Sequence, residues 1–329
     1  MKESNAPAVG RTPFQKWLDK YQGLFYLIPW IIGFVVFKAV PFGQSLYYSF
    51  TDMNFFKSGT QFVGLANYIT AFTTTKITKA LLITFKYAFI TVPLKLVFAL
   101  FIAYILNFKI ACVNLFRTVY YIPSILGGSV AIAVLWKAVF SVDGLLNTVL
   151  RAVTFGLVQG PEWLSDPSYA LWIICFLRIW QFGSAMVLFL AALKGVPADL
   201  YEAATIDGSG EYSTLFRVVI PIAKPGLATV ALLNALAYWN DWYQSLLYIK
   251  QNKVLQPLQA LLMELQNNVE YLNRMAGSMG TAAIQEAAKA PTQTLRMALV
   301  VIIVLPIACA YPFFQRYIVA GLTVGSVKG

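Results

Sequence analysis

The residue types that usually carry catalysis are scarce in this chain. Histidine is absent, and the three cysteines, Cys112, Cys175 and Cys309, are far apart in the sequence. No imidazole is available for a nucleophilic triad, and no cysteine pair has the spacing of a zinc site or a redox motif. A GxxxxGK[ST] phosphate loop is also missing, so the chain lacks the cradle that ATP phosphates need. These absences argue against an enzyme.

The polar segment 195–226 (GVPADLYEAATIDGSGEYSTLFRVVIPIAKPG) is more informative. Pro197 is suited to the first turn of a helix and Gly208 to a left-handed cap at its end, which predicts a short helix from Ala198 to Asp207. The pair Ala203–Ala204 would let another surface approach the helix closely. A second short helix is expected over 211–219, ended by the prolines that follow. The segment is read either as a docking element or as an ordinary connection.

The elements that surround this segment are apolar. Of the 329 residues, 59% are hydrophobic and only 12% are charged, whereas soluble domains carry about 25% charged residues. Stretches of about 20 apolar residues match the thickness of a bilayer. The composition therefore predicts an all-α polytopic membrane protein, and the six expected spans are residues 25–47, 81–106, 119–140, 169–193, 226–249 and 297–314.

The formal net charge of +11 is attributed to loops that fix membrane topology, since no nucleic-acid-binding motif occurs. The basic segment 1–24 and the short loop 107–118 favour a topology with both termini in the cytoplasm. Lys95 and Arg178 fall deep within expected spans. Ionisable groups at that depth face either protein or a water-filled cavity, and both alternatives stay open.

The loop 250–296 is long for a connection between spans. Its stretch QALLMELQNNVEYLNRM has helical spacing, which predicts an amphipathic helix on the extracellular side. The leucines expected on its apolar side are Leu258, Leu261, Leu262 and Leu265.

The string Glu202-Ala203-Ala204-Thr205-Ile206-Asp207-Gly208, with Pro221 thirteen residues after the glycine, resembles the EAA loop of ABC importer permeases. Leu200 and the pair Pro197 and Val196 also match that pattern. Outside the loop, the matching strings are Phe62-Val63-Gly64-Leu65, Phe116-Arg117 and Trp239-Asn240-Asp241-Trp242. The resemblance covers nearly the whole chain and is specific to the carbohydrate-uptake branch.

Two features depart from the family pattern. Leu215 stands where the family usually has phenylalanine. Residues 1–225 resemble the first permease of heterodimeric pairs, whereas the sequence from about 235 onward resembles the second. The resemblance therefore leaves open whether the chain pairs with either type or with itself.

The resemblance implies a type I ABC importer permease fold in a bacterial inner membrane. It divides the chain into a cytoplasmic segment (1–24), a first span with an extracellular loop (25–75), a transmembrane core (76–318) with the EAA loop at 195–225, and a cytoplasmic tail (319–329). The implied partners are a second permease, two ATPase subunits and an extracellular solute-binding protein. ATP and magnesium would be used by the ATPases, and no cofactor is expected on this chain.

The resemblance also implies roles for particular residues. The positions expected to couple to the ATPase are Leu200, Glu202, Ala203, Ala204, Asp207, Gly208 and Pro221. Aromatic faces and neutral hydrogen-bonding groups bind sugars, so the expected substrate pathway is Trp180, Gln181, Asn234, Tyr238, Trp239, Asn240 and Asp241. Tryptophan and tyrosine also mark membrane interfaces, which is the competing interpretation.

Two other functions fit the sequence less well. An ion-coupled secondary transporter would usually show inverted repeats, and none is visible. A membrane-embedded enzyme would need a catalytic constellation at membrane depth, and the sequence offers none.

Overall fold

The computed structural model describes residues 13–53, 59–108, 110–249, 253–276 and 293–326. These residues are almost entirely helical, with one isolated bridge between Thr51 and Phe62. The all-α prediction is confirmed. The helices are α1 (Pro13–Phe34), α2 (Val40–Tyr48), α3 (Ala66–Thr73), α4 (Thr75–Ile105), α5 (Val113–Leu126), α6 (Val130–Val139), α7 (Leu145–Val153), α8 (Pro167–Trp180), α9 (Gly183–Lys194), α10 (Ala198–Ile206), α11 (Glu211–Thr214), α12 (Ile220–Trp239), α13 (Tyr243–Tyr248), α14 (Leu258–Ala276) and α16 (Gln293–Ser326).

Four helical stretches are long and apolar enough to cross a membrane: Tyr21–Tyr48, Thr75–Ile105, Glu211–Trp239 and Gln293–Tyr317. Two bent pairs bring the number to six if each pair forms one span. The pair α5 and α6 is bent by 96°, and the pair α8 and α9 by 44°. The described residues therefore fit the six predicted spans, but two of the spans are broken.

The breaks have local causes that the apolar pattern did not reveal. The expected span 119–140 is interrupted at Gly127-Gly128-Ser129, where the Ser129 hydroxyl caps α6 by accepting from the Ile132 amide at 3.3 Å. Helix α5 ends at the glycine pair Gly127-Gly128, and Ser129 is the N-cap of α6. The expected span 169–193 is interrupted between Trp180 and Gly183.

The fifth span differs most from its prediction. It was expected over 226–249, but the helix runs from Glu211 to Trp239, and α13 follows as a separate element. The expected stop after residue 219 is wrong, because Pro221 and Pro225 lie within the continuous helix. Asn240 and Asp241 end this helix instead.

A widened turn explains how the helix passes Pro221. Residues Leu215–Val219 form a π turn, in which the Ile220 amide bonds the Leu215 carbonyl. A proline ring in a regular α-helix clashes with the carbonyl four residues earlier, and the extra residue of a π turn relieves that crowding. The first span uses the same device, with a π turn at Val35–Ala39 directly before Val40 and Pro41.

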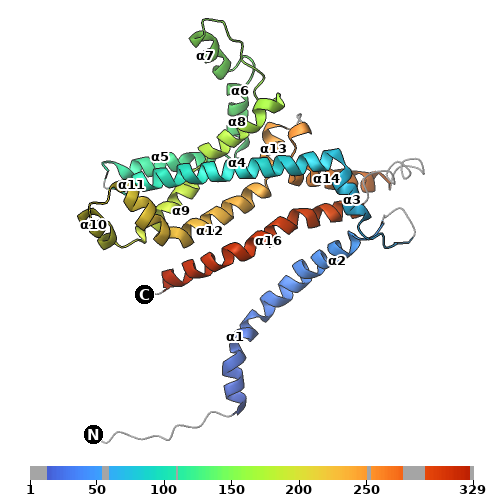
Figure 1. Ribbon diagram of the computed structural model, residues 1–329. Coiled ribbons are helices and arrows are strands. Elements are labelled where there is room, and N and C mark those ends of the chain that lie inside the picture. Colours follow the sequence, from blue (N-terminus) through green and yellow to red (C-terminus); the bar gives the residue numbers. More distant parts are fainter. Residues whose placement is uncertain (1–12, 54–58, 109, 250–252, 277–292, 327–329) are drawn as a thin grey trace, which may run out of the picture.

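The centre of the molecule is a layer of long helices that lie side by side (Figure 1). Helix α4 contacts α8, α9 and α12, and α12 also contacts α16. Small and medium side chains fill these contacts, among them Ala99, Ala103, Met186 and Val219, all below 1% exposed. Helices α10 and α11 lie at one end of this layer, and α3, α13 and α14 lie toward the other.

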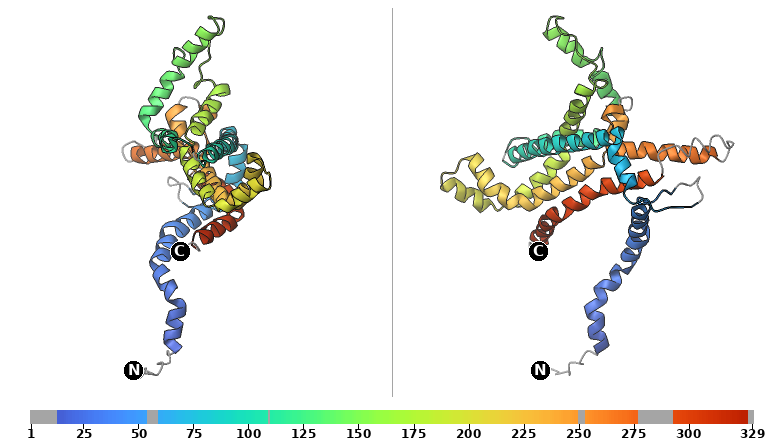
Figure 2. Two further views of the ribbon diagram at one scale, coloured as in Figure 1. Left: turned by 90° about the vertical axis from the view of Figure 1, so that its left-hand side faces the viewer. Right: turned by 45° about the vertical axis from the view of Figure 1, so that its right-hand side comes forward.

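Two segments project from the layer in different directions (Figure 2). The span Tyr21–Tyr48 has no buried residue in its most apolar window. Helices α6 and α7 extend from the opposite side. Both segments carry exposed apolar side chains, which suits surfaces that meet lipid or another chain.

Helix α14 confirms the predicted amphipathic helix. Leu258 and Leu261 are each 1% exposed, and Leu262 and Leu265 pack against the same cluster as α16. Lys76 of α4 forms an ion pair with Glu264 at 3.3 Å. The helix is therefore fixed to the end of the helical layer.

Candidate functional site

Helix α10 matches the short capped helix predicted from the sequence. It begins after Pro197, and Gly208 adopts the left-handed conformation at its end, with φ of +72°. The Ser209 amide donates to the Ala204 carbonyl and the Asp207 amide to the Ala203 carbonyl, each at 2.9 Å. This closure satisfies carbonyls that a helix end leaves free.

One side of α10 faces the bundle. Ala204 is 7% exposed, and Tyr201 packs against the core cluster of α4, α9 and α12. The Asn107 amide donates to the Tyr201 hydroxyl at 3.4 Å. Burial raises the pKa of Tyr201, so its hydroxyl keeps its proton at neutral pH. These contacts hold α10 against the end of α4.

The other side of α10 is open. Glu202, Ala203 and Asp207 are exposed, and Ile206 is 85% exposed. A large apolar side chain at such exposure beside two carboxylates has the character of a contact surface. Of the remaining predicted coupling positions, Leu200 and Gly208 are exposed on the same segment, whereas Pro221 lies in the span that follows.

A second polar site lies inside the helical layer, and we call it the charge cluster. Arg178 of α8 forms an ion pair with Asp241 at 3.2 Å, and the Tyr87 hydroxyl of α4 donates to the same carboxylate at 2.8 Å. The Lys95 ammonium donates to the Tyr238 hydroxyl at 2.7 Å. The Arg178 guanidinium lies over the Tyr238 ring, 4.7 Å from its centroid.

The charge cluster is almost closed to solvent. Lys95 is 5% and Tyr238 1% exposed, and the Asp241 side chain is 7% exposed. Ions at this depth are stable only when their partners replace water. Of the two readings left open for Lys95 and Arg178, the structure therefore supports contact with protein rather than an open cavity.

The charge cluster continues into the two helix breaks. Arg178 donates to the Gln181 side chain at 2.9 Å, and Gln181 in turn donates to the Gly127 carbonyl at 3.1 Å. The Ser124 hydroxyl donates to the Gln181 carbonyl at 3.0 Å and accepts from the Ser184 amide at 2.9 Å. Side chains from each broken span thus bond the backbone groups that the other break leaves free.

The seven predicted pathway residues do not form one surface. Gln181, Tyr238 and Asp241 meet in the charge cluster, whereas Trp239 points to α16 and donates to the Ile303 carbonyl at 3.0 Å. Trp180 lies edge-on to Trp136, with ring centroids 5.3 Å apart. The amides of Asn234 and Asn240 each donate to a carbonyl one turn earlier in α12.

The sequence prediction also missed a member of the charge cluster. Tyr87 has no partner near it in the sequence, and its bond to Asp241 joins positions 154 residues apart. Only the apolar surroundings of Lys95 and Arg178 signalled that an opposite charge was needed nearby.

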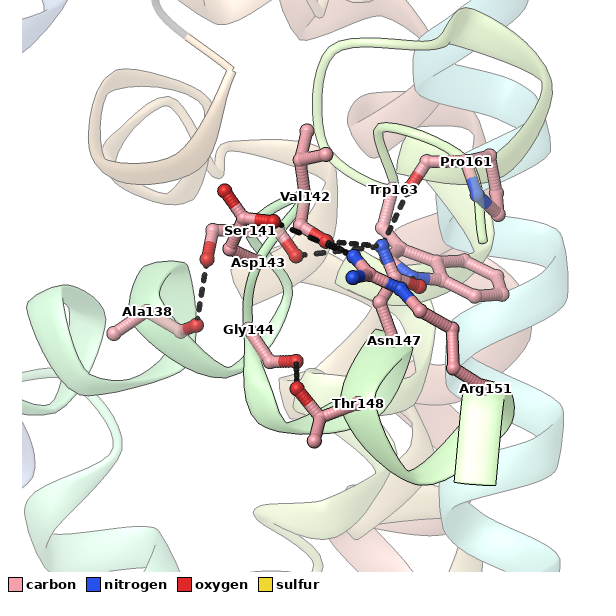
Figure 3. Close-up of polar contacts among 10 residues, drawn as sticks. All are labelled: Ala138, Ser141, Val142, Asp143, Gly144, Asn147, Thr148, Arg151, Pro161 and Trp163. Carbon is pink, nitrogen blue, oxygen red and sulfur yellow. Dashed lines mark hydrogen bonds and ion pairs between the residues drawn. The ribbon is translucent and has the colours of Figure 1, made fainter. Parts of the chain in front are cut away.

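A third polar centre orders the projecting arm of α6 and α7 (Figure 3). Asn147 is fully buried, donates to the Val142 carbonyl at 3.0 Å and the Pro161 carbonyl at 3.2 Å, and accepts from the Trp163 indole at 2.7 Å. Arg151 donates to the same Val142 carbonyl at 2.9 Å. The Asn147 side-chain amide thereby joins the segment that precedes α7 to the segment that follows it.

The capped helix α10, the two bent helix pairs and the buried charge cluster describe a helical protein that crosses a membrane several times. The sequence profile described as "Binding-protein-dependent transport system inner membrane component" matches residues 68–324. The chain belongs to this family, whose members are transport subunits of ABC importers.

Similar proteins agree with this assignment. The chain is 42% identical over 208 residues to the probable ABC transporter permease protein YesP of Bacillus subtilis (strain 168), a match that covers 63% of this chain and 66% of that protein, just under two thirds of its length. It is 30% identical over 213 residues to the probable starch degradation products transport system permease protein AmyD of Thermoanaerobacterium thermosulfurigenes, covering 64% and 70% of the two chains.

The fold matches a solved importer. A chain of the crystal structure of a bacterial ABC transporter involved in the import of the acidic polysaccharide alginate superposes with a TM-score of 0.67 at 17% identity. The match covers 93% of this chain and 99% of that one. The predicted ABC importer permease fold is confirmed.

Proposed function

We propose that this chain is the permease subunit of an ATP-driven carbohydrate importer and that α10 couples it to the ATPase. The observation that carries the proposal is the open face of α10, where Glu202, Ala203 and Ile206 stand free at the end of the spans. Family membership supports it, and so do relatives named for starch degradation products and alginate.

The connections of α10 suit it to transmit movement. Three residues separate it from α9, and four separate it from the helix that begins at Glu211. Tyr201 packs against the core cluster and accepts from Asn107, which links the inner side of α10 to the bundle. A push on α10 would therefore move two spans together and shift the bundle between two arrangements.

The remaining subunits are proposed from membership of the family. Without a phosphate loop it would rely on two separate ATPase subunits, which would bind ATP and magnesium themselves. A second permease would complete the pathway, and an extracellular solute-binding protein would deliver the sugar. No bound cofactor and no nucleic acid enter this proposal.

The proposed orientation puts α10 and both termini in the cytoplasm of a bacterium, in line with the basic loops. The end of the layer that carries α13 and α14 then faces outward. The domain divisions 1–24, 25–75, 76–318 and 319–329 keep their proposed roles, although α16 continues as a helix to Ser326.

For the substrate pathway, we keep the seven predicted positions and assign different roles to five of them. Asn240 is exposed and Asn234 half-buried on α12, where a second permease would leave a path. Gln181, Tyr238 and Asp241 would position the walls through the charge cluster. Asp241 is already paired with Arg178, so this carboxylate is not free to bind a coupling ion.

The test is to replace Ala203 by Trp in the assembled transporter. The bulky side chain would block the close approach of the ATPase, so sugar uptake should fall sharply while membrane insertion stays normal. Gly208→Pro should act similarly by breaking the cap. Tyr26→Trp, at a position 82% exposed in the first span, is the control and should transport normally. Normal uptake with intact ATPase recruitment in Ala203→Trp would reject the coupling role.

A further inference from the structure

Two cavities lie on either side of α13, at the end of the layer away from α10. The first, the Trp242 pocket, has a volume of about 340 Å³ and is lined by Trp242, Ser245, Gln256, Met263, Glu264 and Asn268, among others. The second, of about 590 Å³, includes Lys137, Ser141 and Glu162. Leu246 and Ile249 line both cavities, so the two adjoin.

We propose that the Trp242 pocket is a binding site for a neutral pyranose unit of the incoming saccharide. This inference rests on the proposed function, which makes this the outer end of the permease. The pocket combines one aromatic face with several neutral amides and a hydroxyl. A sugar ring needs both, since its C–H face packs on an indole while its hydroxyls donate to and accept from amides.

The size and composition of the pocket agree with a small ligand. Its volume lies within the roughly 300–1,000 Å³ of small-molecule sites, which are mostly apolar with a few convergent polar groups. The Gln256 side chain donates to Glu264 at 2.7 Å, whereas its own carbonyl oxygen has no partner. The exposed amides of Asn267 and Asn268 add donors and acceptors at the rim.

The walls of the pocket are held in place by contacts already described. Asp241, next to Trp242, is fixed by Arg178 and Tyr87 and accepts from the Gln244 amide at 3.2 Å. On the other wall, Lys76 and Gln256 hold Glu264. Such prior ordering lowers the entropy that a weak ligand must overcome.

The charges favour a neutral sugar over a uronate. Glu264, which is paired with Lys76, is the charged residue among those that line the pocket, so the lining offers no unpaired cation to the carboxylate of an acidic sugar. The adjoining cavity carries one cation and one anion, Lys137 and Glu162, so it adds no net attraction for an anion. This cavity has room for the next unit of a chain, and its Ser141–Val142 wall is fixed by Asn147 (Figure 3).

The experiment measures binding to the full-length chain in lipid nanodiscs by saturation-transfer NMR, with maltopentaose as the neutral probe and pentagalacturonate as the acidic one. Maltopentaose should bind more strongly. Trp242→Ala should weaken it about tenfold, the factor expected for loss of one good aromatic contact. Trp242→Phe should keep most of the binding, because a smaller aromatic face remains.

Matched variants separate the site from general effects. Trp172→Ala removes a tryptophan that is 58% exposed on α8 and should leave binding unchanged. Glu264→Gln should keep maltopentaose binding and improve that of pentagalacturonate. Equal maltopentaose binding by Trp242→Ala and the unchanged chain, or no binding of either probe, would overturn the site, and a preference for pentagalacturonate would overturn the neutral class.

This outcome is distinct from a failure of the proposed function. Co-purification with the ATPase reports on α10 and does not depend on the pocket. A chain that recruits the ATPase but shows no Trp242-dependent sugar signal would reject only the pocket, whereas sugar binding without ATPase recruitment would reject the coupling role.

Discussion

Helix α10 and the charge cluster are built in opposite ways. Helix α10 is a continuous segment of nine residues whose outer face is exposed and whose end is closed by its own backbone. The charge cluster gathers Tyr87 and Lys95 from α4, Arg178 from α8, and Tyr238 and Asp241 from the end of the fifth span, all largely shielded from solvent. One is specified by adjacent residues and the other by the packing of three helices.

This difference separates two tasks. A surface that meets a partner gains from exposure and contributes little to the stability of its own chain. A buried ion pair contributes specificity to the packing, and the loss of one partner strongly destabilises the fold. Mutations in the charge cluster should therefore act first on folding, and mutations in α10 on coupling.

The largest effect on stability is expected from Asp241→Ala. It leaves the Arg178 guanidinium buried without its carboxylate and removes the acceptor of the Tyr87 hydroxyl. Loss of one partner of a buried pair typically costs about 3–5 kcal/mol. Thermal unfolding of the purified chain in detergent, monitored by tryptophan fluorescence, would measure this loss of stability.

Asp241→Asn is the control for that change, because the amide oxygen can still accept from Tyr87 and only the charge is lost. The unfolding temperature of Asp241→Asn should lie between those of Asp241→Ala and the unchanged chain. If Asp241→Ala unfolded at the same temperature as the unchanged chain, the charge cluster would not be a packing element.

A smaller loss is expected from Gly183→Ala at the junction of the two breaks. An added Cβ would collide with the Tyr120 carbonyl and lie 2.7 Å from the Tyr121 Cα, both of them backbone atoms that cannot move away easily. Overpacking of this kind costs about 1–3 kcal/mol. The same unfolding experiment applies, with Gly128→Ala as the control, because no atom lies within 4 Å of a Cβ there.

Equal unfolding temperatures of the Gly183 and Gly128 variants would show that the two broken spans do not need their close approach. The hydrogen bonds of Gln181 and Ser124 would then be what joins the two breaks.

The sequence predicted α10 well because every signal lies within it. Pro197, the alanine pair and Gly208 are local features, and the helix they predict is the one observed. The leucine spacing of α14 worked for the same reason. The coupling role of these residues stays a prediction.

The sequence predicted the breaks and the charge cluster poorly because both depend on distant partners. Apolar content alone does not distinguish a straight span from one broken at Gly127 or Gln181. Likewise, prolines suggested a stop after residue 219, but the π turn at Leu215–Val219 lets the helix continue. The sequence predicts Asp241 as a pathway residue but not its bonds to Arg178 and Tyr87, which lie far from it in the chain.

Gly208→Ala tests the other side of the comparison. The left-handed conformation costs an L-residue about 1–2 kcal/mol, and the loss is local because nothing lies within 4 Å of an added Cβ. Global unfolding should change little, whereas sugar uptake per ATP hydrolysed should fall several-fold because the end of α10 frays. Gly210→Ala is the matched control, because Gly210 has φ of −67° and equally open surroundings.

If the two glycine variants coupled equally well, the cap of α10 would be irrelevant to force transmission. A large drop in unfolding temperature for Gly208→Ala would instead break the contrast, since it would make α10 a stability element.

The smallest effect is expected from Tyr201→Phe, where α10 meets the bundle. The bond from Asn107 to the Tyr201 hydroxyl is long, at 3.4 Å, and its loss should cost below about 1 kcal/mol.

Burial raises the pKa of Tyr201 in the folded chain, so the folded state holds this proton more tightly than the unfolded state. The protonated Tyr201 hydroxyl stabilises the folded state fully below the unfolded pKa of about 10. This stabilisation is lost as the pH rises through the higher folded pKa. Unfolding temperatures measured from pH 8 to 11 should therefore fall more steeply for the unchanged chain than for Tyr201→Phe. Tyr212→Phe, at an exposed position, should follow the unchanged chain. Parallel curves for the unchanged chain and Tyr201→Phe would mean that the Tyr201 hydroxyl does not help to hold α10 against the bundle.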